Sequence, residues 1–257
     1  MRIQFSKYHG AGNDFIIIDN RKNQFSPETS LINKLCHRQF GIGADGLMLL
    51  ELDPYSDFKM RYFNSDGKES TMCGNGGRCI VLFAKSLGII NTQTNFNGVD
   101  GLHNATIVDK NTVNLKMKDV DNIEHDDDFY LLNSGSPHYV TFVKDVDKID
   151  VGTEGRLIRQ SVLAESGGVN VNFVQITSGG IKIRTYERGV EGETLACGTG
   201  AVASAIATNH WLEEQKNDYQ INARGGILNV SFIKSDDEKY TNIWLKGPAM
   251  HVFDGLY

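Results

Sequence analysis

The sequence predicts an α+β protein of two pseudo-symmetric domains, each a curled, barrel-like mixed or antiparallel β-sheet wrapped around one central helix. Three observations lead to this prediction. A cysteine-containing segment occurs twice in altered form, at 69–76 and 193–200. Blocks upstream of each copy also repeat in the same order. Short strand-like runs separated by Gly, Asn and Asp outnumber helical runs, which is typical of sheets that curl or close.

The two copies of the repeat keep a nearly constant spacing. The first reads Glu-Ser-Thr-Met-Cys-Gly-Asn-Gly, and the second, 124 positions later, reads Glu-Thr-Leu-Ala-Cys-Gly-Thr-Gly. Upstream, 59–63 aligns with 182–186 and 12–15 aligns with 135–138, both at an offset of 123. A repeat of this length indicates two structurally similar halves, because each unit is domain-sized and too long for a solenoid.

Strands are expected in order along both halves, wherever β-branched and aromatic residues lie between turn residues. In the first half the expected strands are 3–8, 15–19, 46–51, 58–63, 105–108 and 113–117. In the second half they are 139–143, 172–176, 181–186, 220–223, 227–232 and 241–245.

Three helices are expected. The first has Ser26 as its N-cap and Pro27 as its first helical residue, and ends before Gly41. The second covers 78–87 and follows the first cysteine segment. The third covers 201–212, and its nearly uniform apolar composition predicts that it is buried.

Chain length allows two domains of ordinary size. We expect a first domain at 1–118 and a second at 119–248, with the C-terminal tail 249–257 as a candidate addition to the first. The acidic stretch 119–128 is the expected linker, and the predicted active site lies in the cleft between the halves.

Composition excludes several classes of function. A net charge of −6 without a Lys/Arg cluster argues against nucleic-acid binding. The longest apolar run near the N-terminus, 15–18, is too short for a signal peptide or a membrane span, so a cytoplasmic location without membrane contact is expected. The four cysteines are then reduced thiols, and the lack of a C-x-x-C pair argues against structural zinc.

Two of the cysteines are candidates for catalysis. Cys73 and Cys197 each precede a Gly-x-Gly turn that opens an apolar, helix-like run. A thiol at a helix N-terminus has a lowered pKa, which suits a general base. Cys36 and Cys79 lie inside helix-like runs and are expected to be small buried hydrophobic residues. A redox disulfide between Cys73 and Cys197 is the alternative interpretation.

The chemistry follows from an amino acid lying between the two helix N-termini. Its α-carboxylate would accept from the backbone N–H groups of Gly74, Asn75, Gly198 and Thr199. One cysteine, as thiolate, would remove the α-proton, and the other, as thiol, would return a proton to the far side. The product would have inverted configuration.

No cofactor and no metal is expected. The literal G-x-G-x-x-G at 41–46 follows a helix and opens a strand, the reverse of a dinucleotide site. The sequence has no P-loop, and no lysine in a setting that suggests a Schiff base to pyridoxal phosphate.

The chain resembles the diaminopimelate epimerase family over essentially its full length. The matching segments are 9–15, 63–67, 72–76, 169–170, 186–189 and 196–200. Members of this family are pyridoxal-phosphate-independent isomerases. They interconvert LL- and meso-2,6-diaminopimelate, a step toward lysine and peptidoglycan precursors.

The resemblance implies roles for residues of this chain. It implies that Cys73 and Cys197 are the acid/base pair, and it implies a homodimer. The residues implied to hold the small amino-acid substrate, including its distal groups, are Asn13, Asn64, Asn170 and Arg188. Glu187 is implied to accept from an ammonium group and, together with His138, to tune the thiols.

The chain departs from the family pattern at three places. Ser136 stands where many members have Asn, Gly46 stands where some have a substrate-contacting side chain, and the loop 188–193 is one residue longer. Three other functions are disfavoured. A proline or hydroxyproline racemase is disfavoured by Cys-Gly-Asn-Gly at the first thiol, where those families have Cys-Gly-His-Gly. Retention of both thiols disfavours a non-catalytic amino-acid-binding module, and a phenazine-biosynthesis-like isomerase lacks the cysteine pair.

Overall fold

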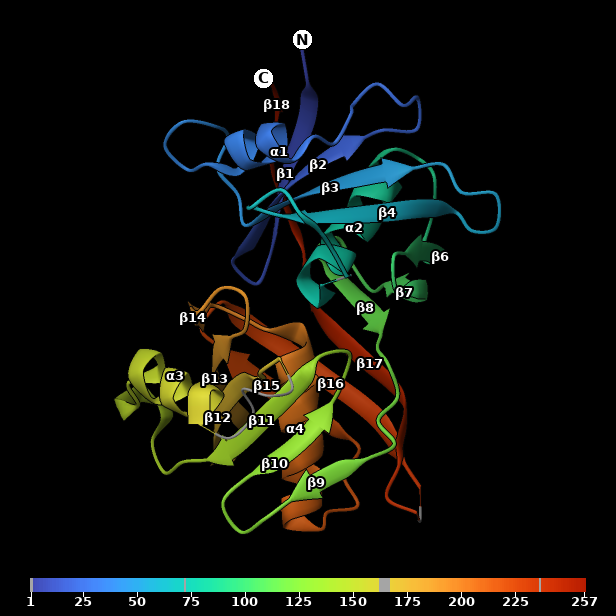
Figure 1. The fold of residues 1–257 in the computed structure, drawn as a ribbon. Helices are drawn as coiled ribbons and strands as arrows, with labels where there is room; N and C mark the ends of the chain where they lie inside the picture. Colours follow the sequence, from blue (N-terminus) through green and yellow to red (C-terminus); the bar gives the residue numbers. More distant parts are fainter. Residues whose placement is uncertain (1, 72, 162–166, 236) are drawn as a thin grey trace. The chain divides into compact units, whose positions relative to one another are not determined.

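The computed structural model describes residues 2–71, 73–161, 167–235 and 237–257 (Figure 1). The chain divides into two compact units. Unit 1 contains Met1–Leu115 and Gly247–Tyr257, and unit 2 contains Lys116–Lys246. Each unit combines a β-sheet with two α-helices among its described residues, which confirms the predicted α+β class.

The sheet of unit 1 contains mixed strand directions. Its strands are β1 (Gln4–Gly10), β2 (Asn13–Asp19), β3 (Gly46–Glu51), β4 (Phe58–Asn64), β5 (Glu69–Ser70), β6 (Gln93–Gly98), β7 (Gly101–Ile107), β8 (Thr112–Lys116) and β18 (Met250–Leu256). β18 pairs with β1, and β1 pairs with β2. β2 runs parallel to β3 and β4 runs parallel to β6, whereas the pairs β3–β4, β4–β5, β6–β7 and β7–β8 are antiparallel.

The sheet of unit 2 repeats this plan. Its strands are β9 (Ile123–His125), β10 (Tyr130–Asn133), β11 (Pro137–Phe142), β12 (Asn170–Thr177), β13 (Gly180–Glu187), β14 (Gly192–Thr194), β15 (Asp218–Ala223), β16 (Gly226–Lys234) and β17 (Tyr240–Pro248). β11 is parallel to β12 and β13 is parallel to β15, with antiparallel pairing elsewhere. The repeat seen in the sequence therefore extends to strand order and direction.

Each sheet packs on one of two equivalent helices. In unit 1, α2 (Gly74–Ser86) packs against β1, β2 and β3, and in unit 2, α4 (Gly198–Leu212) packs against β10–β13, β15 and β16 (Figure 1). The smaller helices are α1 (Thr29–Cys36) in unit 1 and α3 (Val151–Ser161) in unit 2. A short 3₁₀ helix, η1 (Val146–Lys148), precedes α3.

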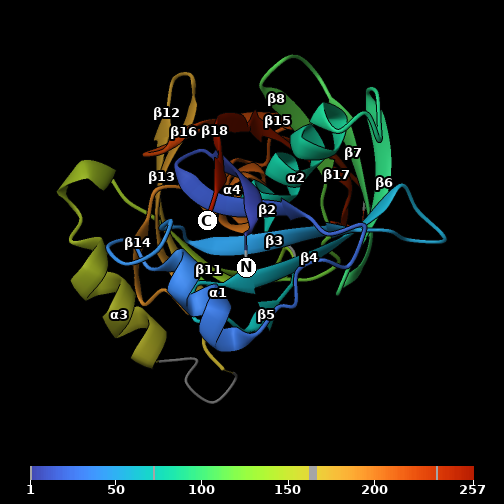
Figure 2. The same cartoon turned by 90° about the horizontal axis from the view of Figure 1, so that it is seen from above.

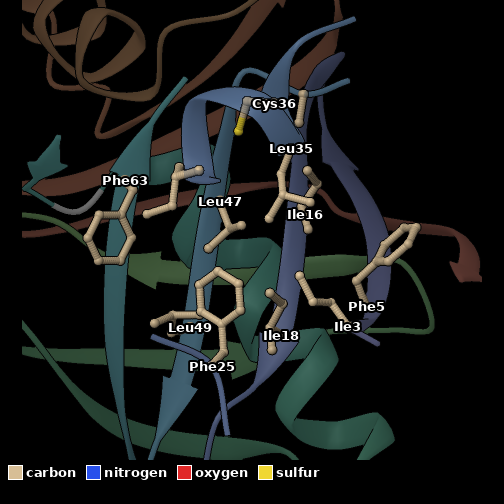
Figure 3. Packing of buried hydrophobic residues seen from close by; sticks show 12 residues of the cluster. Ile3, Phe5, Ile16, Ile18, Phe25, Leu35, Cys36, Leu47, Leu49 and Phe63 are labelled. Atoms are coloured by element: carbon tan, nitrogen blue, oxygen red, sulfur yellow. The ribbon is translucent and has the colours of Figure 1, made fainter. Parts of the chain in front are cut away.

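Strands β2 and β3 are buried on both faces. Ile16 and Leu47 point to one face, where they join Leu35 of α1 in a continuous apolar cluster (Figure 3). Met48 points to the opposite face, toward Gly76 of α2, where an added Cβ would lie 3.1 Å from its sulfur. In the view of Figure 2, α1 lies on the outer side of β3 and β4. Burial of both faces explains the nearly continuous apolar sequence of these strands.

The first helix differs from the prediction. Residues 26–27 precede α1 rather than begin it, and Glu28 is the N-cap. Burial of Phe25 and a bond of 3.0 Å from Glu28 N–H to the Ser26 carbonyl set a turn before the helix. At the other end the His37 ring accepts two backbone N–H groups, so a turn replaces the predicted helical run toward Gly41.

The two central helices begin earlier than predicted, because each cysteine is an N-cap and the glycines after it are helical. Helix α3 and strands β5, β6, β9, β10, β14 and β18 were not predicted. Two glycines weaken the helical signal of α3, and one of them, Gly155, is needed because an added Cβ would lie 2.4 Å from Tyr186 Cβ.

The acidic stretch 119–128 is more ordered than the predicted linker. It contains β9, which pairs with β10, and Val120 forms an antiparallel bridge with Tyr240. The whole stretch belongs to unit 2.

Candidate active site

Cys73 and Cys197 occupy equivalent positions. Each has an extended backbone, with φ/ψ of −99°/134° and −115°/117°, and each is the N-cap of its central helix. The sulfur of Cys73 accepts from Gly76 N–H at 3.5 Å, and the sulfur of Cys197 accepts from Gly200 N–H at 3.4 Å. Both sulfurs thus lie in the field of a helix N-terminus, which favours a thiolate.

The residues directly after each cysteine form the first helical turn. Gly74, Asn75, Gly198 and Thr199 occupy its first two positions, where the helix supplies no acceptor for the backbone N–H. A Cβ on Gly200 would lie 2.4 Å from Asn172 Oδ1, so glycine allows close packing at this turn. This geometry is suited to an anion such as a carboxylate.

In unit 1 a chain of amides reaches the sulfur of Cys73. The thiol donates to Asn13 Oδ1 at 3.6 Å, and Asn75 Nδ2 donates to the same oxygen at 3.4 Å. Asn13 Nδ2 donates to Asp45 Oδ2 at 2.6 Å. Arg78 Nη2 donates to Asn75 Oδ1 at 2.7 Å. Two ions, Asp45 and Arg78, therefore fix the orientation of both amides.

Arg78 is fully buried in α2. Its remaining N–H groups donate to the carbonyls of Gly74, at 3.0 Å, and Pro248, at 3.3 Å. Burial lowers its pKa, and the nearby thiols of Cys79 and Cys73 act in the opposite direction. A buried guanidinium bonded to neutral oxygens supplies positive charge beneath the first turn.

In unit 2 a different chain reaches the sulfur of Cys197. Its Sγ lies 3.5 Å from Thr199 Oγ1, which lies 2.8 Å from His138 Nε2. His138 is fully buried, and its Nδ1 lies 3.0 Å from Asn172 Nδ2. Burial, reinforced by the charge of Arg188, lowers the pKa of His138 to about 3, so the ring is neutral at physiological pH.

Asn170 organises a second cluster in unit 2. Its Nδ2 donates to Ser136 Oγ at 3.0 Å and to the Pro137 carbonyl at 3.2 Å, and its Oδ1 accepts from Arg188 N–H at 2.9 Å. The Arg188 guanidinium donates to the Gly168 carbonyl at 3.3 Å. Ser136, the residue that departs from the family pattern, thus holds Asn170 directly.

The other predicted residues lie at strand ends. Asn64 ends β4 and is exposed, and its backbone closes a turn with Gly67 and Lys68. Glu187 ends β13 and is half-buried. Gly46 begins β3, where an added Cβ would lie 2.6 Å from the Phe63 carbonyl oxygen, so close backbone packing explains this glycine.

A paired Arg–Glu contact supports the short strand before each cysteine. Arg61 Nε and Nη2 donate to the two oxygens of Glu69 at 2.7 and 2.8 Å. Arg184 donates in the same two-pronged way to Glu193 at 2.6 and 2.8 Å, and Arg224 joins Glu193 at 2.8 Å. Each glutamate lies four residues before its cysteine, so the pair fixes the strand that leads to the thiol.

The other two cysteines lie away from the helix N-termini and are buried. Cys36 and Cys79 are buried, and burial raises the pKa of Cys36 to about 12 and that of Cys79 further still. Sequence reasoning missed Arg78 and Asn172. The available signals were an Arg within the mostly apolar first two turns of one helix and an Asn in the interior of a largely buried strand.

Among the described residues, no group of three or more His, Cys, Asp or Glu side chains could hold a metal ion. None of the helices formed by these residues is both long and apolar enough to span a membrane.

Solved structures show the same fold at low sequence identity. A phenazine biosynthesis protein of the PhzF family from Bacillus anthracis is 12% identical with a TM-score of 0.80, and the match covers 100% of this chain and 99% of that one. A probable proline racemase from Agrobacterium radiobacter is 16% identical with a TM-score of 0.74, covering 99% and 92%.

Sequence comparisons are more specific. The family described as diaminopimelate epimerase matches residues 5–122 and 130–252. A diaminopimelate epimerase of Flavobacterium psychrophilum is 54% identical over 250 residues, covering 96% of this chain and 97% of the relative. Another, of Chlorobaculum tepidum, is 40% identical over 255 residues, covering 96% and 98%. The chain therefore belongs to the diaminopimelate epimerase family.

Proposed function

We propose that this protein interconverts LL- and meso-2,6-diaminopimelate without pyridoxal phosphate. One of the two cysteines removes the α-proton as a thiolate, and the other, as a thiol, donates a proton to the opposite face. The reverse reaction exchanges their roles. In the substrate complex this chemistry requires both sulfurs to reach one α-carbon from opposite sides.

One observation carries the proposal: a cysteine N-caps each of the two central helices, in a chain of this family. A free thiol titrates near ~8.5, so the helix field leaves a usable thiolate fraction at neutral pH. The backbone N–H groups after each cysteine stabilise negative charge that develops on the carboxylate when the α-proton leaves.

Recognition of the distal end of the substrate is assigned to neighbouring side chains. Arg188 binds the distal carboxylate with its planar guanidinium, and Glu187 binds the distal ammonium. Asn13 and Asn64 contribute amide contacts, and Asn170 supports Arg188 through its backbone bond. Because the substrate has a charged group at each end, recognition at both ends separates it from proline.

Proton exchange tests the reaction and the substrate together. The reduced enzyme is incubated in deuterated water with LL-diaminopimelate, meso-diaminopimelate, L-proline or trans-4-hydroxy-L-proline. Proton NMR follows the α-hydrogen, and chiral chromatography follows the new isomer. We expect exchange with inversion only for diaminopimelate. Exchange on a proline would overturn the proposed substrate. If the enzyme's thiols are free and no compound exchanges, the proposed activity is overturned.

The proposal includes a cytoplasmic location, because both thiols must remain reduced to exchange protons. It also includes a homodimer, which the family resemblance implies. Light scattering on the purified protein checks the second point, since a mass of one 28.5 kDa chain would contradict it.

A further inference from the structure

The two thiols have side-chain partners of opposite hydrogen-bonding polarity. Both sulfurs accept one backbone N–H from the helix that they cap, at 3.5 Å and 3.4 Å, so this contribution is nearly equal for Cys73 and Cys197. Among the described contacts, the sulfur of Cys73 faces an amide oxygen and the sulfur of Cys197 faces a hydroxyl group. An acceptor favours the protonated thiol, whereas a donor favours the thiolate.

At Cys73 the polarity is set by two ions. The carboxylate of Asp45 can only accept, so the amide nitrogen of Asn13 faces it at 2.6 Å and the oxygen of Asn13 faces the sulfur. The guanidinium of Arg78 can only donate, so the oxygen of Asn75 faces Arg78 and its nitrogen faces Asn13. The Asn13 oxygen is therefore a fixed acceptor for the Cys73 S–H.

At Cys197 the polarity is set by a backbone carbonyl. Asn172 Nδ2 donates to the Tyr139 carbonyl at 3.0 Å, and its Oδ1 accepts from Thr185 at 2.9 Å. The amide nitrogen then donates its second hydrogen to His138 Nδ1, which places the ring proton on Nε2. This proton is directed at Thr199 Oγ1, 2.8 Å away.

The hydroxyl of Thr199 completes the chain. Since its oxygen accepts from His138, its own hydrogen is available for the Cys197 sulfur at 3.5 Å. Every donor in the series from Asn172 onward points toward the sulfur. We infer that, in the enzyme without substrate, Cys197 is the resting thiolate and Cys73 is the resting thiol.

Charged groups also lie on the side of each sulfur. Near Cys73 lie Arg78 and the neutral thiol of Cys79. Asp45, which accepts from Asn13, belongs to an ion cluster with Arg38, Asp14 and Lys7. On the Cys197 side they are Glu187, Arg188, Arg184, Glu193 and Arg224, with neutral His138. Arg78 and Arg188 both donate to neutral oxygens, Arg78 to those of Gly74, Asn75 and Pro248 and Arg188 to the Gly168 carbonyl. The charge of Arg78 opposes the inferred polarity at Cys73.

The inference rests on the proposed function and names its starting state. From this state the Cys197 thiolate takes the α-proton and becomes a thiol, while Cys73 gives its proton to the other face and becomes a thiolate. One isomer thus meets the resting enzyme directly. The other must meet the minor form, in which the proton lies on Cys197. Thr199, His138 and Asn172 act as positioning residues for the sulfur.

Site-resolved alkylation in the absence of substrate tests the inference. The protein is treated with iodoacetamide across a pH series, and mass spectrometry quantifies the peptides of Cys73 and Cys197. The pH midpoint of each rate is compared, because absolute rates also reflect exposure. We expect the Cys197 midpoint to lie about one pH unit or more below that of Cys73. An equal or reversed order would overturn the inference.

Thr199→Val removes the donor while keeping the side-chain volume. It should raise the Cys197 midpoint by about one pH unit and leave that of Cys73 unchanged. Thr208→Val is the matched control, since Thr208 lies in the same helix, is buried and donates to the Ser204 carbonyl. A Thr199→Val midpoint equal to the wild-type value, with an unchanged melting temperature, would contradict the inference. Because no substrate is present, these midpoints are measured independently of the proposed reaction, and its failure would not change them.

Discussion

The two units share a frame and differ in what lies behind each thiol. In unit 1 the chain of amides from Cys73 leads to Arg78, a buried cation. In unit 2 the chain from Cys197 leads to His138, which is buried and neutral. The residue 124 positions after Arg78 is Val202, also fully buried, so this cation has no counterpart in unit 2. The two units thus share their strands and central helices, whereas the polar residues that connect to the two thiols differ.

Removing either thiol is the most direct way to break the comparison. Cys73→Ser and Cys197→Ser should each lower epimerisation by roughly 10³-fold, because a hydroxyl is a poor general base at neutral pH. The rate of inversion is measured by chiral chromatography. Cys36→Ser is the control, since this thiol is buried and has a raised pKa. Full turnover by either single mutant would disprove the two-base scheme.

Charged recognition is assigned only to unit 2. Arg188→Met should raise KM for diaminopimelate by roughly tenfold or more, since a hydrogen bond to a charged group contributes about 1.5–3 kcal/mol. Steady-state kinetics provide the measurement. Arg188→Lys keeps the charge but loses the planar fork, and should give an intermediate value. An unchanged KM and substrate preference would remove Arg188 from the site.

The Arg–Glu pairs of the two units should contribute differently to the free energy of unfolding. Glu193→Gln should lower the free energy of unfolding by about 1–3 kcal/mol, because Glu193 binds two arginines and its side chain is only 17% exposed. Glu69→Gln should lower it by no more than about 1 kcal/mol, because that side chain is 36% exposed. Urea unfolding of both variants gives the comparison, and the reverse ranking would contradict the account.

Acid should destabilise unit 2 before unit 1. His138 has a folded-state pKa of about 3, so below its usual value near 6.5 the unfolded chain binds more protons and folding weakens as pH falls. The slope is about 1.4 kcal/mol per pH unit. Asp14 in unit 1, whose pKa is lowered to about 2 by Arg38 and Lys7 against the cost of burial, matters only below about pH 4.

Hydrogen exchange at pH 7 and pH 5 reports the two units separately. Protection should fall in unit 2 at the lower pH and should hold in unit 1. His138→Gln should remove this difference, because the amide does not titrate. Equal losses in both units, or no change in the mutant, would show that another group controls the acid response.

Much of the fold was visible in the sequence. The duplicated blocks indicated two similar halves, and runs of β-branched and aromatic residues between turn residues placed most of the long strands, with β3 correct at both ends. Strands as short as β5 and β14 carry too few residues for a pattern, and β18 is largely exposed. These strands form because neighbouring strands supply their hydrogen bonds, which is tertiary information that no local pattern contains.

For the site, the sequence predicted the candidate residues but not the hydrogen bonds that connect them. The spacing of the two cysteines identified the thiols, and the family motifs identified the surrounding candidates, whose roles remain predictions. The connections of Arg78 and Asn172 could not be read from the sequence, because each depends on which way an amide faces. The bonds of Asn170 to Ser136 and Arg188 were likewise not visible in the sequence, and its predicted contact with substrate stays a prediction.

Isotope labelling at early times tests the central claim that two thiols act on one α-carbon. LL-diaminopimelate is converted in deuterated water. Before about one tenth of it has reacted, mass spectrometry measures deuterium in the product and in the remaining substrate. The account predicts deuterium in the inverted product and protium in the remaining substrate, because each face is served by a different sulfur. Retention of the original proton in the product, or equal deuterium in both pools, would contradict it.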